Sequence, residues 1–270
     1  MAGMIDIVIP CRNAPDVLAL TFSHLWAYAM DHVRRIFILD NVSTAPRMDA
    51  LLGMLQTHPK VIVVRHDRNV GVWCSINRGL AMSEADTILC VTSDVLIGPM
   101  TIPILLRAKE DTGRAFLCPE NGCVGMSQYA NLFLVPQLGP LVENDHNGAC
   151  WLMDWKRLRE EVGYYDPRFY ICYGDVDYFE RLRDAGERDN SLRATIVGGS
   201  RVCHLDKQSR RADMTNAQDT DVSLRDGERF REKWKERPDI VARHPIASAE
   251  REIAFKEHEL GGWEQGKVGG

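Results

Sequence analysis

The sequence predicts an α/β fold in which helices flank a mostly parallel central sheet, followed by a C-terminal helical extension. The first observation is that short runs rich in Ile and Val alternate, along the first half of the chain, with longer segments whose apolar residues recur at helical spacing. The second is that these short runs are apolar throughout, as in strands buried on both faces of a parallel sheet. Such an alternation of strand and helix favours a sheet with helices on both faces.

Each element is predicted from its own pattern and its bounding turn residues. In the first half, strands are expected at residues 5–9, 35–39, 61–64 and 87–91, and helices at residues 16–30, 46–56 and 72–83. In the second half, strands are expected at residues 116–118, 148–154, 194–197 and 201–204, and helices at residues 155–162 and 221–234. The segment YICYGDVDYFERLRDAG, residues 170–186, predicts a short apolar strand, a glycine, and an amphipathic helix capped by Gly186. Residues 238–270 are highly charged and predict a peripheral helix with a frayed end.

The composition of the chain indicates which classes of protein it fits and which it does not. The chain has 270 residues, 45% of them hydrophobic and 26% charged, which is enough to bury the core of one large domain. It lacks a run of about 18 apolar residues, the length of a transmembrane helix, and its N-terminal residues lack the pattern of a signal peptide. The eight cysteines form no CxxC pair or zinc-binding spacing, which favours a reducing compartment. We therefore expect a cytoplasmic protein, and the net charge of -5 disfavours nonspecific binding of nucleic acid.

Polar residues follow each of the four strands predicted in the first half. These segments are residues 10–13, 40–44, 66–71 and 92–95, and each contains Asp or Asn. Taken singly, such a segment often forms only a turn, because Asp and Asn favour turns. In open α/β sheets, however, ligands bind at the carboxyl ends of the strands. Four polar strand ends at one edge of a sheet together predict a ligand site.

Six stretches, in this order, carry a family resemblance: IVIPCRNAPDVL, ILDNVSTAP, VVRHDRNVGVWCSINRGL, ILCVTSDVLIGP, GACWLMDWKRLREEVGYYDPRFYICYGDVDYFERLRDAG and VCHLDKQS. They resemble family 2-type glycosyltransferases with the GT-A fold, of the branch that includes rhamnosyltransferase-like enzymes. RFREKW is a weaker match, and the resemblance covers roughly residues 4–235. It implies a Rossmann-like GT-A domain over residues 1–235, with a nucleotide-sugar-binding half at 1–115 and an acceptor or catalytic half at 116–210. Residues 236–270 would form a C-terminal peripheral extension.

The resemblance implies a binding site for a nucleoside-diphosphate sugar in the first half. In it, Pro10 and Asn13 would lie beside the nucleobase or ribose, and Asp40 would form a hydrogen bond with one of them. Arg68 would donate to a phosphate. The implied donor-binding residues are Pro10, Asn13, Asp40, Arg68, Asn69, Gly71 and Ser93. Asn69 and Gly71 would allow the main chain to approach the nucleotide.

The family's metal-binding DxD motif corresponds here to Thr92-Ser93-Asp94, which keeps only the last carboxylate. The resemblance implies that Asp94 and His204 bind a divalent metal, Mn²⁺ or Mg²⁺, beside the diphosphate. One carboxylate suffices for such an ion when phosphate oxygens supply other ligands. Lys207, Arg210 and Arg211 would form a basic loop that closes over the leaving diphosphate. The alternative for this loop is a solvated basic segment, and the alternative for His204 is a structural histidine.

Asp175 falls on the catalytic base of inverting relatives when the DVD segment is aligned. An inverting transfer needs one carboxylate to accept the proton of the attacking hydroxyl. The structural alternative for Asp175 is a helix N-cap. Asp177 fits better as a first-turn acid paired with Arg181 than as a group that contacts the acceptor. The acceptor-side candidates are Trp151, Tyr173 and Asp177, and a glycine at position 174 replaces the family's usual glutamate.

The resulting hypothesis is a glycosyltransferase that moves a sugar from a nucleoside diphosphate to a hydroxyl acceptor, with inversion. The acceptor would be a glycan, a lipid-linked glycan or a modified nucleobase. One alternative is transfer to hydroxymethylated bases in DNA, which the basic residues in 207–211 keep open despite the acidic net charge. Another is a noncatalytic nucleotide-sugar-binding scaffold, suggested by the reduced DxD motif and the missing glutamate.

Overall fold

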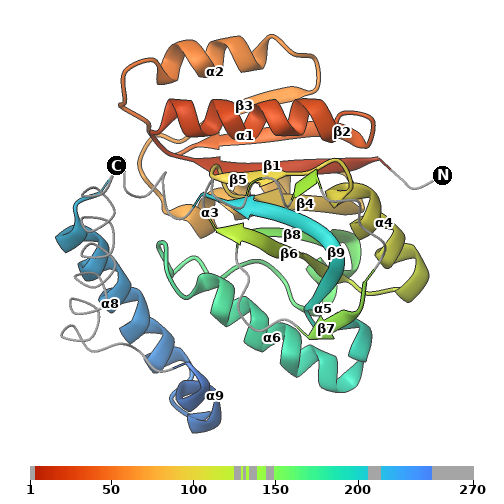
Figure 1. Cartoon of the computed structure of the whole chain (residues 1–270). Helices are drawn as coiled ribbons and strands as arrows, with labels where there is room; N and C mark the ends of the chain where they lie inside the picture. Colours follow the sequence, from red (N-terminus) through yellow and green to blue (C-terminus); the bar gives the residue numbers. More distant parts are fainter. Residues whose placement is uncertain are drawn as a thin grey trace, which may run out of the picture.

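The structure is a computed structural model that describes residues 4–124, 129, 132–133, 139–143, 149–205 and 214–244. Over these residues the chain forms a nine-stranded sheet with the order β3-β2-β1-β4-β8-β6-β9-β5, and β7 pairs with β9 (Figure 1). The strands are β1 Ile5–Cys11, β2 Val33–Asp40, β3 Val61–Arg65, β4 Thr87–Val91, β5 Val95–Ile97, β6 Phe116–Val124, β7 Leu141–Glu143, β8 Cys150–Asp154 and β9 Thr195–His204.

Strands β1 to β4 are parallel, so their carboxyl ends meet at one edge of the sheet. Cys11 at the end of β1 is in register with Asp40 at the end of β2, which is in register with Arg65 at the end of β3. β4 runs parallel to β1 on the other side. The sheet becomes mixed where β8 pairs antiparallel with β4. The fold class predicted from the sequence is therefore confirmed.

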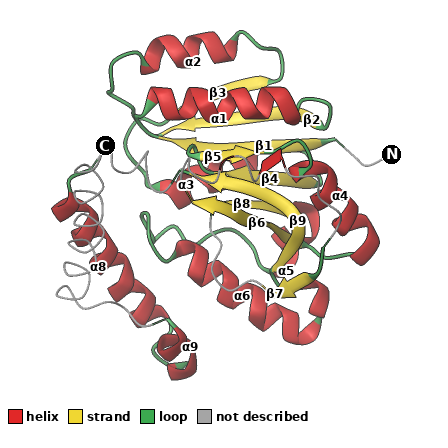
Figure 2. Ribbon diagram, viewed as in Figure 1, coloured by secondary structure: helices red, strands yellow, loops and turns green. Residues whose placement is uncertain are grey.

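Helices cover both faces of the sheet and bury two apolar clusters. Figure 2 shows α1 and α2 on one side and α6 on the other. The helices are α1 Pro15–Tyr28, α2 Met48–Gln56, α3 Val72–Met82, α4 Thr101–Thr112, α5 Trp155–Glu161, α6 Gly174–Arg188, the 3-10 turn η2 Asn190–Leu192, α8 Asn216–Lys233 and α9 Pro238–Arg243. One cluster packs α1, α2 and α4 against the sheet, and the other packs α3, α5, α6, α8 and α9. Successive side chains of β1 belong to opposite clusters, because Ile7 and Ile9 pack in the first and Val8 packs in the second.

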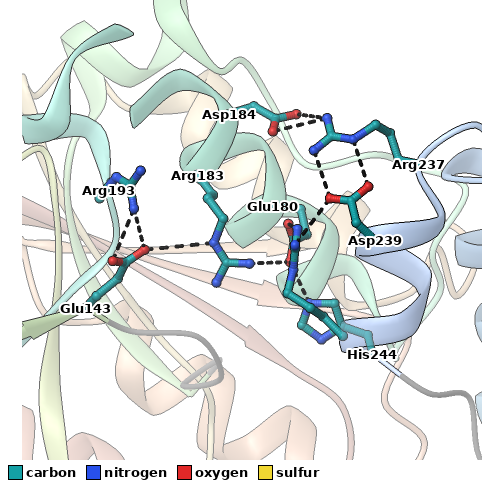
Figure 3. Close-up of polar contacts among 9 residues, drawn as sticks. Glu143, Glu180, Arg183, Asp184, Arg193, Arg237, Asp239 and His244 are labelled. Carbon is teal, nitrogen blue, oxygen red and sulfur yellow. Dashed lines mark hydrogen bonds and ion pairs between the residues drawn. The ribbon is translucent and has the colours of Figure 1, made fainter. Parts of the chain in front are cut away.

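The C-terminal helices are joined to α6 by buried and half-exposed ion pairs. Glu180 of α6 is 1% exposed and contacts Arg243 at 2.8 Å and His244 at 2.6 Å (Figure 3). Ile240 of α9 is fully buried in the same apolar cluster as Phe230 of α8. The described residues beyond 235 therefore pack on the domain, while the domain boundary predicted at residue 235 stays a prediction.

Three elements differ from the sequence-based expectation. Residues 194–197 and 201–204 were expected as two strands, but β9 is continuous and passes the positive φ of 85° at Gly199. Gly186 does not end α6, which continues to Arg188; a Cβ atom at Gly186 would overlap the side chain of Arg193. Residues 170–172 form bends rather than a strand, because their main-chain N–H groups donate to a side chain of α8.

The elements β5, β7, α4 and η2 were not among those predicted. Each of the strands β5 and β7 has three residues, too few to show a hydrophobic period. No helix within the described part of the chain is long and apolar enough to cross a membrane.

Candidate functional site

A cavity of about 830 Å³ opens at the carboxyl ends of β1 and β4. The ends of these strands contribute residues 10–12 and 92–94, and the start of α3 contributes Gly71 to Trp73. The loop before α6, the end of β9 and α8 also line the cavity. The cavity therefore lies where the polar strand ends predict a ligand site.

The structure brings most of the predicted site residues together. Those that line the cavity are Pro10, Asn69, Gly71, Ser93, Asp94, Trp151, Asp175 and His204. Those that do not line it are Asn13, Asp40, Arg68, Tyr173 and Asp177. Lys207, Arg210 and Arg211, the basic loop expected to close over the diphosphate, lie outside the described residues.

Asp94 and His204 form the part of the cavity wall that suits a cation. Oδ1 of Asp94 lies 3.5 Å from Nε2 of His204, and their side chains are 5% and 26% exposed. The antiparallel pairing of β5 with β9 brings them together, because Val95 is in register with His204. The main-chain N–H of Leu205 also donates to the carbonyl of Asp94 at 2.8 Å.

The donor atoms of Asp94 and His204 indicate whether this pair can hold a divalent cation. Within the described ranges, no group of three or more His, Cys, Asp or Glu side chains is placed to hold a metal ion. A carboxylate and an imidazole are both ligands of Mn²⁺-type cations, and a diphosphate in the cavity would supply further oxygens. Asp94 and His204 therefore fit a cation that binds together with a phosphate ligand.

Asp175 lies in the first turn of α6 and lines the cavity. It is not the N-cap, because that position is Tyr173, whose φ of 60° turns the chain into the helix. Oδ1 of Asp175 accepts the N–H of Val176 at 3.0 Å. A negative charge in the first turn of a helix is favoured by the helix dipole.

Asp177, two residues further along in the same first turn, joins α6 to α8. Its carboxylate is fully buried and lies 2.6 Å from Nζ of Lys233 and 3.1 Å from Nε of Arg181. Nε1 of Trp234 also donates to it at 3.1 Å. This placement agrees with the structural role that the sequence favoured for Asp177.

Asp40 and Asn13 shape the main chain behind the cavity. Nε of Arg65 donates to Asp40 at 2.7 Å, and the hydroxyl and N–H of Ser43 donate to the same carboxylate. Oδ1 of Asn13 accepts the N–H groups of Thr44 and Ala45 at 2.8 and 2.9 Å. Both side chains therefore hold the segment that follows β2, and neither reaches the cavity surface.

Gly71 has a packing role besides its place in the cavity wall. Its φ is 81°, and a Cβ atom there would overlap the carbonyl oxygen of Tyr170. The N–H of Val72 donates to the same oxygen at 2.8 Å. The glycine is therefore required for a close approach between α3 and the loop before α6. Nearby, the side-chain amide of Asn77 exchanges hydrogen bonds with the main chain of Tyr165 at 2.8 and 2.9 Å.

Trp73 and Trp151 line the cavity as a stacked pair. Their ring centroids lie 6.4 Å apart at an interplanar angle of 25°. Trp73 also places its ring against Gly174, where a Cβ atom would overlap it. The glycine that replaces the family's usual glutamate is thus accounted for by the indole beside it.

Helix α8 lines the cavity between Gln218 and Arg229, and sequence reasoning missed this contribution. Its contribution is Gln218, Asp221, Val222, Arg225, Asp226 and Arg229. The helix was predicted to begin at residue 221, but it begins at 216 behind a capping box of Thr215 and Gln218. The spacing of a threonine and a glutamine three residues later is a sequence signal that predicts this start. No local signal shows which face of α8 meets the cavity.

Comparison with known proteins adds the family. Residues 6–134 match the model of glycosyl transferase family 2. The first half of this domain is therefore similar to the family 2 glycosyl transferases. This domain is 23% identical over 234 residues to the O-antigen biosynthesis protein RfbC of Myxococcus xanthus, a match that covers 77% of this chain. The chain spans about a fifth of the length of that curated relative, since the match covers 18% of it.

Solved structures confirm that the domain has the GT-A fold. One is the mannosyltransferase PcManGT from Pyrobaculum calidifontis in complex with GDP-Man and Mn²⁺, with a TM-score of 0.61 and 13% identity. The match covers 87% of this chain and 65% of that one. Another is GalNAc-T7 with UDP, GalNAc and Mn²⁺, with a TM-score of 0.60 and 14% identity, covering 91% of this chain and 58% of that one. The resemblance drawn from the six sequence stretches is thereby confirmed as to family and fold.

Proposed function

We propose that this GT-A domain transfers a sugar from a nucleoside-diphosphate donor to a hydroxyl acceptor, with inversion. The observation that carries the proposal is that Asp94, His204 and Asp175 line one cavity at the carboxyl edge of the sheet. The family match and the nucleotides bound in the structural neighbours support it.

Asp175 is assigned the role of general base. Asp175 lines the cavity from the first turn of α6, where the helix dipole favours negative charge. In an inverting transfer, this group takes the proton of the acceptor hydroxyl as the oxygen attacks the anomeric carbon. The sugar's bond to the diphosphate breaks on the opposite side, and the diphosphate leaves with its electron pair.

Asp94 and His204 are assigned to the diphosphate side of the cavity. They would hold a divalent cation, Mn²⁺ or Mg²⁺, which when bound offsets the negative charge that develops on the leaving diphosphate. Asn69, Gly71 and Ser93 line the cavity on the same strand-end edge and would contact the nucleotide sugar.

The remaining donor candidates act differently in this proposal. Asn13 and Asp40 would act through the segment after β2 that they hold, rather than by touching the nucleotide. Arg68 does not line the cavity and is assigned no contact. Tyr173 would set the entry of α6 through its left-handed φ of 60°.

The test is a direct assay of transfer. The chain is incubated with UDP-, GDP- and dTDP-sugars, each with Mn²⁺ and with a panel of glycan, lipid-linked and hydroxymethylated-DNA acceptors, and released nucleoside diphosphate is measured. Release that depends on an acceptor and is lost in Asp175→Asn supports the proposal. Donor binding by calorimetry without release for any acceptor would instead favour a noncatalytic scaffold.

A further inference from the structure

A carboxylate on α8 holds the loop that leads into α6. Asp226 is fully buried, and three consecutive main-chain N–H groups donate to its Oδ2. Their nitrogens lie 3.0 Å away for Tyr170, 2.8 Å for Ile171 and 2.9 Å for Cys172. Hydrogen bonds to an ionised acceptor are roughly twice as strong as neutral ones, so this carboxylate restrains the loop strongly.

The same loop is also tied to α3, on the donor side of the cavity. Val72 donates its N–H to the carbonyl of Tyr170 at 2.8 Å, and Nε1 of Trp73 donates to the carbonyl of Ile171 at 3.0 Å. The missing side chain of Gly71 leaves room for this contact. Residues 170–172 therefore form a bridge whose three N–H groups donate to α8, and the carbonyls of Tyr170 and Ile171 accept from α3.

This bridge ends just before Asp175. After Cys172 the chain passes Tyr173, with its φ of 60°, and enters α6 at Gly174. Only these two residues separate Cys172 from Asp175, and Gly174 lies against the Trp73 ring. Because the connection is this short, the position of the bridge determines where the Asp175 carboxylate lies.

The charge of Asp226 is balanced locally. Nη1 of Arg229 lies 2.8 Å from its Oδ1, which also accepts the N–H of Tyr170 at 3.1 Å, while Oδ2 accepts from all three N–H groups. An ionised carboxylate offers about four lone-pair positions, which suits this set of donors.

We propose that Asp226 is a positioning residue that sets the place of Asp175 by holding the main chain of residues 170–172. Asp226 also lines the cavity, but its carboxylate is fully buried and bonded to the loop, so its effect is assigned to the loop. The inference rests on the proposed function, since it takes Asp175 as the group that accepts the proton.

Four variants of the full chain separate this role from a general loss of stability. Asp226→Ala removes the acceptor, whereas Asp226→Asn keeps one oxygen that can face the three N–H groups. Asp226→Glu keeps the charge but lengthens the side chain by one methylene and displaces the loop. Glu180→Gln is the matched control, because it changes another buried carboxylate to an amide, on the face of α6 that meets α9.

Two measurements are made on each variant. The first is hydrogen exchange of the amides at residues 170–172, and the second is kcat together with the donor Kd. Asp226→Ala is expected to speed exchange at these amides at least about tenfold and to lower kcat at least about tenfold, because catalysis is sensitive to misplacement of the base. Donor Kd should stay within about twofold.

The other variants complete the comparison. Asp226→Asn should keep kcat within about threefold of the wild-type value, since one oxygen can still accept all three N–H groups. Asp226→Glu should lower kcat while the protein stays folded, and it replaces the alanine variant if that one fails to fold. Glu180→Gln should change neither the exchange at residues 170–172 nor kcat.

The inference is overturned if a transferring wild-type chain and its Asp226→Ala variant share the same kcat, or if exchange at residues 170–172 is unchanged. It is also overturned if Glu180→Gln lowers kcat as much as Asp226→Ala does. A wild-type chain that transfers no sugar overturns the proposed function instead, so the two failures are distinguishable.

Discussion

Nε2 of His204 lies 3.5 Å from Oδ1 of Asp94, although 109 residues of chain lie between them. The pairing of β5 with β9 produces this contact, since it places the end of β9 beside the turn that follows β4. The two side chains proposed as metal ligands thus meet at the cavity without any short metal-binding motif in the sequence.

Asp94→Asn should abolish the metal-dependent part of donor binding. A donor at a hundredfold excess over its Kd should stabilise the wild-type fold by about 2.7 kcal/mol, and we expect most of this only when Mn²⁺ is present. Thermal unfolding with each nucleotide sugar, with and without Mn²⁺, measures the effect. His58→Gln is the control, because His58 packs on Trp26 away from the cavity. An equal Mn²⁺-dependent rise in Tm for Asp94→Asn would remove Asp94 from the metal site.

Asp175→Asn should lower the transfer rate by about 10²- to 10⁴-fold, the usual contribution of a general base. The amide is nearly isosteric with the carboxylate but cannot accept the proton. Steady-state kinetics and calorimetric donor binding measure the two consequences, and donor affinity should be retained. Asp184→Asn, further along α6 where Asp184 contacts Arg237, is the matched control and should transfer at the wild-type rate. Near wild-type transfer by Asp175→Asn would assign the base elsewhere.

Gly174→Ala should destabilise the protein by about 1–3 kcal/mol, because the added methyl group would overlap the Trp73 indole. Gly53→Ala is a control for which the opposite change in stability is expected. Gly53 is exposed inside α2 with no atom within 4 Å of an added Cβ, so the same change should stabilise the protein by about 0.5–1 kcal/mol. Denaturant unfolding measures both free energies. If both variants shift stability in the same direction, the close approach of Gly174 to Trp73 is not what requires the glycine.

The contact between α6 and α9 should make stability depend on acidic pH. Burial acts to raise the pKa of Glu180, but hydrogen bonds from His244 and Arg243 and the charge of Arg183 outweigh it and lower the pKa to about 2. The unfolded value is about 4.3. Because the folded pKa is the lower one, Glu180 stabilises the fold above about pH 4.3, and this contribution is lost as the pH falls toward about 2.

Glu180→Gln should therefore be less stable than the wild type at neutral pH by on the order of 2–3 kcal/mol. The difference should shrink as the pH is lowered through the acidic range. Unfolding free energies at a series of pH values measure it. Glu84→Gln is the control, since Glu84 is 84% exposed and pairs only across the surface with Arg34. A difference in unfolding free energy between the wild type and Glu180→Gln that stays constant with pH would contradict this account.

Much of the sheet follows from local patterns. The apolar runs predicted at residues 5–9, 35–39, 61–64 and 87–91 all lie within β1 to β4. A buried parallel strand is apolar on both faces, so the pattern is continuous and easy to recognise. The glycine-rich middle of β9 interrupts that pattern, which is why one strand was predicted as two. Residues 170–172 are apolar too, yet their N–H groups bind Asp226 instead of a neighbouring strand.

Local sequence patterns were enough to predict the parallel half of the sheet and the edge where its strand ends meet. They were also enough to recognise the family motifs that contain Asp94, Asp175 and His204. The structure was needed to show that Arg65 holds Asp40 behind the cavity. It was also needed to show that α8 lines the cavity and holds the loop before α6. Hydrophobic periodicity is a property of neighbouring residues, so it can be recognised locally. The main-chain partners of the buried Asp226 carboxylate lie more than 50 residues away along the chain, and only packing brings them to it.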